Sequence, residues 1–240
     1  MPVSQELLIG KASREFRHFY RRYSRDFPWR QRRTTPFGIL VAEMLLRQTR
    51  AAQVAEIWPS LLERYPGPRE VASADPEELY ALLLPLGLGR QRVEALQDMS
   101  STLIKRHRGR VPRKIEALSN LPHVGLYSAH ATACFAFGRR VALVDANVIR
   151  VLSRLFGVTL KQDNRRAPEA WRLAEAIMPK KGPPKEHHYG LLDFAALVCT
   201  PGKPLCRECP LNKECAWCWT HVWRNVDFGA KPPDMPLWPR

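Results

Sequence analysis

Apolar residues recur along this chain at the three- and four-residue spacing of helices, and almost no segment alternates in the way of a strand. The pattern predicts helices over residues 4–25, 36–48, 51–64, 68–73, 76–84, 90–107, 114–120, 126–137, 146–156, 167–178 and 186–198. The run from Phe37 to Leu46 is too continuous for a surface helix, so we expect it to be buried on most sides. The sequence therefore predicts an all-α protein. Its Trp- and Pro-rich segment from Trp217 to Arg240 is irregular, either packed on the body or extended from it.

The charge of the chain points to a polyanionic partner. Its 240 residues contain 38 Lys and Arg against 23 Asp and Glu, a net charge of +15. Such a surplus favours nucleic acid, because each neutralised phosphate releases a condensed counterion, although a generally basic surface would give the same count. The apolar runs are far shorter than the roughly 18 residues of a membrane span, and Leu7 to Ile9 is too short for a signal peptide. We therefore expect a cytoplasmic protein without a membrane segment.

Four cysteines near the end of the chain have a spacing typical of a metal centre. The two-residue step brings two thiolates to one centre, and prolines stiffen the loops that could bring the other two. Both an iron–sulfur cluster and a zinc ion accept four thiolates, whereas a disulfide framework is disfavoured in a reducing cytosol. We interpret Cys134 and Cys218 as a buried small residue and a spare thiol outside the pattern. The pattern C-x6-C-x2-C-x5-C comprises Cys199, Cys206, Cys209 and Cys215.

A short turn, Leu121-Pro122-His123-Val124-Gly125, separates two predicted helices. Such a turn directs backbone N–H groups and the positive end of the second helix at one point, where a phosphate would fit. Any helix hairpin needs a similar turn, so the turn alone is weak evidence for binding.

The order of hairpin, downstream aspartate and cysteine pattern resembles the helix-hairpin-helix DNA glycosylases of the endonuclease III superfamily, from about Phe27 to Cys215. The strings Phe27-Pro28-Trp29-Arg30 and Glu43 to Thr49 are similar to the branch that contains MutY-type adenine glycosylases and Mig-type thymine glycosylases. The chain resembles the Mig-type enzymes more closely in Leu45-Leu46-Arg47, Gln91-Arg92, Tyr127, Val144-Asp145-Ala146-Asn147 and Asp193-Phe194. One departure is His123, where the family usually has Gly; His adopts unusual backbone angles less readily, so we expect an altered phosphate contact.

The resemblance implies a two-domain fold and a DNA partner. Residues 29–138 would form a helical barrel with the hairpin, residues 1–28 and 139–220 an iron–sulfur cluster domain, and residues 221–240 a separate tail. The four cysteines would hold a 4Fe-4S cluster, with zinc as the alternative. We expect a monomer that binds double-stranded DNA with a mismatched or damaged base, associated with the nucleoid in a bacterium or archaeon. The implied DNA-binding residues are Arg47, Gln48, Leu88, His123, Val124 and Gly125, although Leu88 could equally be a core residue.

Two carboxylates lie in opposite sequence environments. Glu43 lies in an apolar run, where loss of water would raise its pKa and leave a proton to donate. Asp145 lies at a predicted helix start, which favours the ionised form and suits a group facing developing positive charge. Breaking an N-glycosidic bond builds an oxocarbenium-like sugar, so this pair fits glycosylase catalysis. The alternatives are structural: Asp145 could be only an N-cap, and Glu43 a buried carboxylate paired with an arginine.

Tyr127 indicates the reaction subtype. Members of the superfamily that also cut the strand use a Lys at this position, because a Schiff base needs an amine. Tyr has none, so we predict a catalytic role beside the sugar or the extruded base, unless Tyr127 is a core aromatic. The favoured function is monofunctional removal of thymine or uracil opposite guanine. The alternatives are adenine removal opposite guanine or 8-oxoguanine and, more remotely, a non-catalytic DNA-binding iron–sulfur protein.

Overall fold

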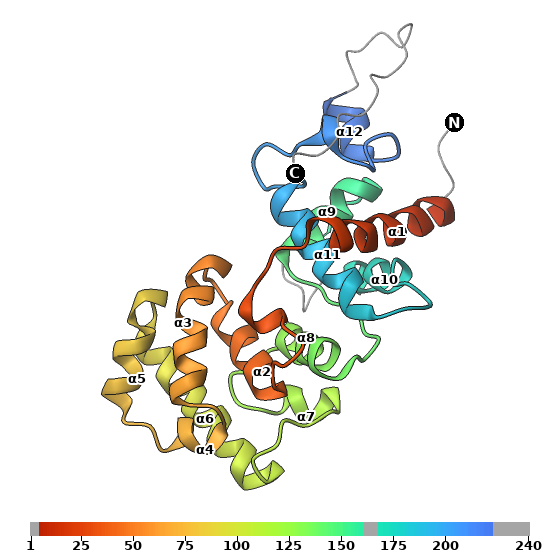
Figure 1. The fold of residues 1–240 in the computed structure, drawn as a ribbon. Helices are drawn as coiled ribbons and strands as arrows, with labels where there is room; N and C mark the ends of the chain where they lie inside the picture. Colours follow the sequence, from red (N-terminus) through yellow and green to blue (C-terminus); the bar gives the residue numbers. More distant parts are fainter. Residues whose placement is uncertain (1–4, 161–167, 223–240) are drawn as a thin grey trace, which may run out of the picture. The chain divides into compact units, whose positions relative to one another are not determined.

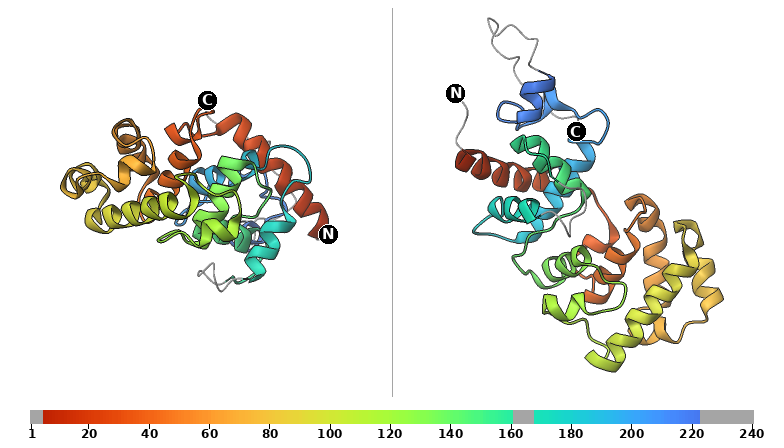
Figure 2. Two further views of the ribbon diagram at one scale, coloured as in Figure 1. Left: turned by 90° about the horizontal axis from the view of Figure 1, so that it is seen from below. Right: turned by 180° about the vertical axis from the view of Figure 1, so that it is seen from behind.

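A computed structural model describes residues 5–160 and 168–222 (Figures 1 and 2). These residues form helices joined by turns and loops, and no strand occurs among them, which confirms the predicted all-α class. The contacts divide the chain into two compact units. One is Asp26–Arg140, and the other combines Met1–Arg25 with Val141–Arg240.

The Asp26–Arg140 unit is organised around a buried helix, α2. All nine residues of α2 from Phe37 to Leu45 are buried, and α2 packs against α3 and α8. Thr35 begins the helix, since its side chain accepts a hydrogen bond from the Gly38 amide. The unit contains η1 (Pro28–Arg30), α2 (Pro36–Leu45), α3 (Ala51–Arg64), α4 (Pro68–Ala72), α5 (Pro76–Leu83), η2 (Leu84–Leu86), α6 (Gly89–His107), α7 (Ile115–Ser119) and α8 (Leu126–Phe137).

The second unit is built on the close packing of its first helix, α1, against α11, which lie side by side in Figure 1. Gly190 permits this approach, because a Cβ at this position would lie only 1.8 Å from the Phe16 carbonyl oxygen. The unit contains α1 (Gln5–Tyr23), α9 (Ala146–Phe156), α10 (Pro168–Ala176), α11 (Pro184–Leu197), η4 (Cys206–Glu208) and α12 (Ala216–His221).

Most expected helix bounds agree with the structure to within two residues, and two larger differences occur. The helix predicted over 36–48 ends at Leu45, because the chain then turns and Gln48 takes a left-handed φ of 56°. The segment from Trp217 was expected to be irregular, but α12 continues to His221. The rest of that expected tail, residues 223–240, lies outside the described residues. None of the helices in the described ranges is both long enough and apolar enough to span a membrane.

A fully buried histidine gives the second unit a pH-dependent stability. The ring of His187 in α11 lies edge-on to that of Phe16 in α1, with 5.8 Å between centroids. Burial, together with the nearby His188 and Arg17, holds the pKa of His187 well below its ordinary value. The folded protein therefore keeps this imidazole neutral, whereas in the unfolded chain it takes up a proton below about pH 6.5.

We predict that the free energy of unfolding is highest above about pH 6.5 and falls as the pH decreases, by up to about 1.4 kcal/mol per pH unit. The measurement is denaturant unfolding between pH 7.5 and 5 of the wild type and His187→Gln, in which this position does not titrate. The variant should have a flatter profile than the wild type. Equal slopes in the wild type and His187→Gln would contradict the assignment.

Candidate functional site

The hairpin between α7 and α8 holds a histidine in a backbone conformation that favours glycine. His123 has φ 60°. Its carbonyl accepts a 2.9 Å hydrogen bond from Arg47 Nη1, and its Nε2 lies 3.0 Å from Asp98 Oδ2. The next residue, Val124, is buried and its amide donates to the Leu121 carbonyl, while Gly125 begins α8 as its N-cap. A left-handed conformation costs a non-glycine residue about 1–2 kcal/mol, which these contacts help to offset.

Gln48 and Leu88 share two unusual properties. Both have left-handed φ angles, 56° and 55°, and both are exposed. Leu88 is 52% exposed, so the alternative that it belongs to the core is wrong. Both residues line one cavity of about 360 Å³ together with Arg47 and His123. The structure thus brings four of the predicted DNA-binding residues to one place.

The predicted acid, Glu43, is buried in the last turn of α2 with 4% of its surface exposed. Tyr127 lies in the first turn of α8 and is half-buried. Both residues belong to the Asp26–Arg140 unit. A buried carboxyl and a partly accessible phenol are compatible with contact to a substrate, and their catalytic roles remain predictions.

Asp145 is the N-cap of α9, in the second unit. Its Oδ1 accepts from the Val148 amide and its Oδ2 from Asn147 Nδ2, both at 2.8 Å. Asn147 in turn accepts from Arg150, whose Nε donates to the Cys199 carbonyl. The capping function expected as the structural alternative is therefore present. The same contacts hold a half-buried carboxylate in one orientation, as a catalytic role would require.

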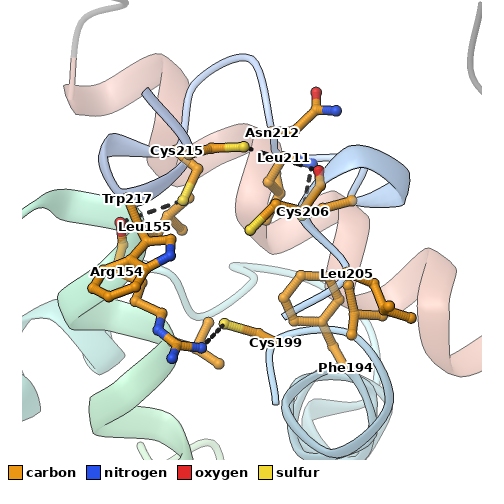
Figure 3. Close-up of a pocket in the computed structure, with 14 residues that line it drawn as sticks. Arg154, Leu155, Phe194, Cys199, Leu205, Cys206, Leu211, Asn212, Cys215 and Trp217 are labelled. Atoms are coloured by element: carbon orange, nitrogen blue, oxygen red, sulfur yellow. Dashed lines mark hydrogen bonds between the residues drawn. The ribbon is translucent and has the colours of Figure 1, made fainter. Parts of the chain in front are cut away.

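The four predicted metal ligands line a single cavity in the second unit, of about 30 Å³. Figure 3 shows Cys199, Cys206 and Cys215 around this cavity. Cys199 follows α11, Cys206 is the first residue of η4 and Cys209 its C-cap, and Cys215 is the N-cap residue of α12. The other lining residues include apolar side chains such as Val151, Leu155 and Phe194.

Two of the sulfur atoms have hydrogen-bond donors close to them. The Leu211 amide donates to Cys209 Sγ at 3.4 Å, and Arg154 Nη1 lies 3.5 Å from Cys199 Sγ. Burial raises the pKa of Cys215 to about 11 and also raises those of Cys199 and Cys209. Within residues 5–160 and 168–222, no three His, Cys, Asp or Glu side chains come close enough together to hold one metal ion.

Cys218 lies at the same cavity, although the sequence interpretation set it aside as a spare thiol. It is 1% exposed, and its Sγ lies 3.9 Å from the Cys206 carbonyl oxygen. A hydrogen bond from the Cys218 thiol lowers the pKa of Cys206 to about 7. The sequence signal that could have identified it is its spacing from Cys215, which makes a second C-x2-C pair beside Cys206 and Cys209.

One protein family and several individual proteins are similar to this chain. Residues 41–176 match the family described as HhH-GPD superfamily base excision DNA repair protein. The thymine-DNA glycosylase of Aeropyrum pernix is 41% identical over 212 residues, 87% of this chain and 95% of the relative. The thymine/uracil-DNA glycosylase of Methanothermobacter thermautotrophicus is 37% identical over 199 residues, 83% of this chain and 89% of the relative.

A solved structure has the same fold. A thermostable thymine-DNA glycosylase superposes with a TM-score of 0.85 at 34% identity, covering 91% of this chain and all of that one. The resemblance inferred from the hairpin and cysteine patterns is thereby confirmed. The chain belongs to the HhH-GPD superfamily of base excision DNA repair proteins.

Proposed function

We propose that this protein is a monofunctional DNA glycosylase that removes thymine or uracil opposite guanine in base excision repair. The observation that carries the proposal is its similarity, over most of both chains, to thymine-DNA and thymine/uracil-DNA glycosylases. The exposed pair Gln48 and Leu88 supports it, because a base must leave the duplex before any pocket can hold it. We expect the protein to act as a monomer in the cytoplasm, in association with the nucleoid.

The reaction replaces the bond between C1′ and the base by a bond between C1′ and a water oxygen. Asp145 would stabilise the positive charge that develops on the sugar and accept the proton of the attacking water. Glu43 would donate a hydrogen bond or proton to the departing base, which leaves with the bonding electron pair. Tyr127 would lie beside the sugar or stack on the extruded base. The hairpin, through His123, Val124 and Gly125, would bind a phosphate of the same strand.

The cysteine-lined cavity fits a 4Fe-4S cluster as a structural group. All four predicted ligands face one apolar cavity, and the Leu211 amide and the Arg154 guanidinium are placed to donate to thiolates. A zinc ion needs four thiolates around one atom, whereas a cluster spreads them over four irons. We favour the cluster because the order and spacing of the four cysteines resemble those of the family, and zinc is the alternative. When bound, the cluster would cross-link α11, η4 and the start of α12.

We predict that anaerobically purified protein is brown, absorbs broadly near ~400 nm and contains about four iron and four sulfide per chain. Cys199→Ser should lose most of the iron, whereas Cys218→Ser should keep it, because Cys218 is the cavity thiol outside the predicted ligand set. A colourless protein with one zinc per chain, lost in Cys218→Ser and retained in Cys199→Ser, would instead assign the metal to the two C-x2-C pairs.

We predict that the protein releases thymine and uracil from G·T and G·U duplexes and leaves A·G and A·8-oxoguanine duplexes intact. The measurement is single-turnover incubation of each duplex, with abasic sites scored as strand breaks after alkali. Asp145→Asn and Glu43→Gln should each slow release by at least about 10²-fold, because each removes a group that acts in proton transfer or charge stabilisation. Adenine release would support the alternative assignment. Near-wild-type rates in both variants would show that the catalytic residues are misassigned.

We predict that base release leaves the DNA strand uncut and that borohydride traps no covalent adduct, because Tyr127 supplies no amine. The test is incubation with a G·U duplex and borohydride, followed by denaturing electrophoresis. Tyr127→Lys places an amine at the position that forms the Schiff base in the strand-cutting relatives and should give some trapping. A stable adduct with the wild type would show that another nucleophile exists and would overturn the monofunctional assignment.

A further inference from the structure

A buried arginine connects the two loops that carry the exposed left-handed residues. Arg92 lies in α6 and is 7% exposed. Its Nε donates to the Gly87 carbonyl at 2.8 Å, its Nη1 to the Leu45 carbonyl at 3.1 Å and its Nη2 to the Arg47 carbonyl at 3.2 Å. Its Nη2 also donates to the Thr49 hydroxyl. One guanidinium therefore bonds to the loop after α2 and to the loop before α6.

Two of these carbonyls belong to the peptides that immediately precede the exposed residues. The Arg47 carbonyl is part of the peptide joining Arg47 to Gln48, and the Gly87 carbonyl is part of the peptide joining Gly87 to Leu88. A peptide group is planar, so fixing the direction of its carbonyl restricts φ of the next residue. Those two φ angles are the left-handed values of 56° and 55°.

A purely structural function would account for only part of this arrangement. Arg92 satisfies a carbonyl at the end of α2, as many residues near helix ends do. The bonds to the Gly87 and Arg47 carbonyls hold turns whose side chains, Leu88 and Gln48, are exposed and add little to the core. The left-handed conformation of both residues is strained and gains nothing from their own side-chain burial. The contacts of Arg92 thus hold the backbone at the two residues whose side chains project from the protein surface.

We propose that Arg92 is a positioning residue for base extrusion: its guanidinium fixes the backbone of Gln48 and Leu88 together, so that both side chains are set to enter the duplex before DNA binds. This inference rests on the proposed glycosylase function. Lys could not replace Arg92, because one ammonium nitrogen cannot reach carbonyls on both loops in the way that the planar five-donor guanidinium does.

The test compares Arg92→Lys with Arg106→Lys, the same change at an exposed position near the end of α6. Two quantities are measured on a G·T or G·U duplex: extrusion, from the fluorescence of 2-aminopurine beside the mismatch, and single-turnover base release. We expect Arg92→Lys to reduce extrusion and base release at least 10-fold while the dissociation constant for DNA changes less than 3-fold. Arg106→Lys should behave as the wild type.

A double-mutant comparison separates positioning from general damage to the fold. In a Gln48→Ala, Leu88→Ala background, adding Arg92→Lys should change base release less than 2-fold, because the side chains that Arg92 positions are gone. An equal loss in both backgrounds, or full extrusion by Arg92→Lys, would overturn the inference. If Arg92→Lys does not fold, Thr49→Val removes one partner of Arg92 at the half-buried loop and should reduce extrusion about 3-fold; unchanged extrusion would also overturn it.

The fluorescence keeps this inference separable from the proposed function. Extrusion by the wild type that depends on Arg92, without release of any base, would support the positioning function and reject the glycosylase assignment. Base release that is equally fast in the wild type and in Arg92→Lys would support the glycosylase assignment and reject the positioning function.

Discussion

Carbonyl groups at the ends of buried helices need hydrogen-bond donors, and this chain meets that need with arginine side chains in both units. Arg92 donates to the end of α2 and to two neighbouring turns. In the second unit, Arg150 donates to the Ala195 and Cys199 carbonyls at the end of α11, and Arg154 donates to the Thr200 and Pro201 carbonyls beyond it. A buried carbonyl without a partner would cost about 1–3 kcal/mol, and a cation also complements the negative end of a helix. The path of the chain around both candidate sites depends on these bonds.

Because several arginines bond within the protein, the net charge has to be interpreted with these bonds in mind. A surplus of 15 positive charges indicates a polyanionic partner, but several of the arginines are committed to the protein itself. Arg92 is buried among carbonyls, and Arg25 pairs with the fully buried carboxylate of Asp193 at 2.7 Å. The number of arginine side chains that could contact phosphates is therefore smaller than the sequence count, and such contacts have to come from exposed residues such as Arg47. Net charge alone could nominate DNA as the partner but could not identify the binding surface.

The sequence predicted helix bounds, which local patterns determine. It did not predict the left-handed backbone conformations, which depend on contacts between distant residues. The helices expected over 51–64, 126–137 and 146–156 have the same bounds as α3, α8 and α9, because a helical apolar period and end signals, such as the Asp145 cap, are encoded within each segment. No local signal marks Gln48 or Leu88 as left-handed, since neither is Gly or Asn and their backbone contacts come from Arg92 in α6. Cys218 was missed for a different reason. The spacing pairs it with Cys215, but the pattern C-x6-C-x2-C-x5-C already supplies four ligands without Cys218.

The positions of the non-glycine residues with left-handed backbone conformations link the fold to the proposed function. Among the described residues four non-glycine positions have positive φ: Gln48, Leu88, Arg108 and His123. Arg108 is the C-cap of α6, where a left-handed residue commonly ends a helix. The other three line one cavity, and at about 1–2 kcal/mol each their combined strain is a substantial part of the roughly 5–15 kcal/mol that stabilises a domain. Strain of this size persists only where surrounding contacts enforce it, here the bonds from Arg92 and Arg47. Three enforced conformations around one exposed cavity are difficult to explain by stability. The proposed base extrusion would account for them, because it needs side chains held in fixed positions before a distorted duplex binds.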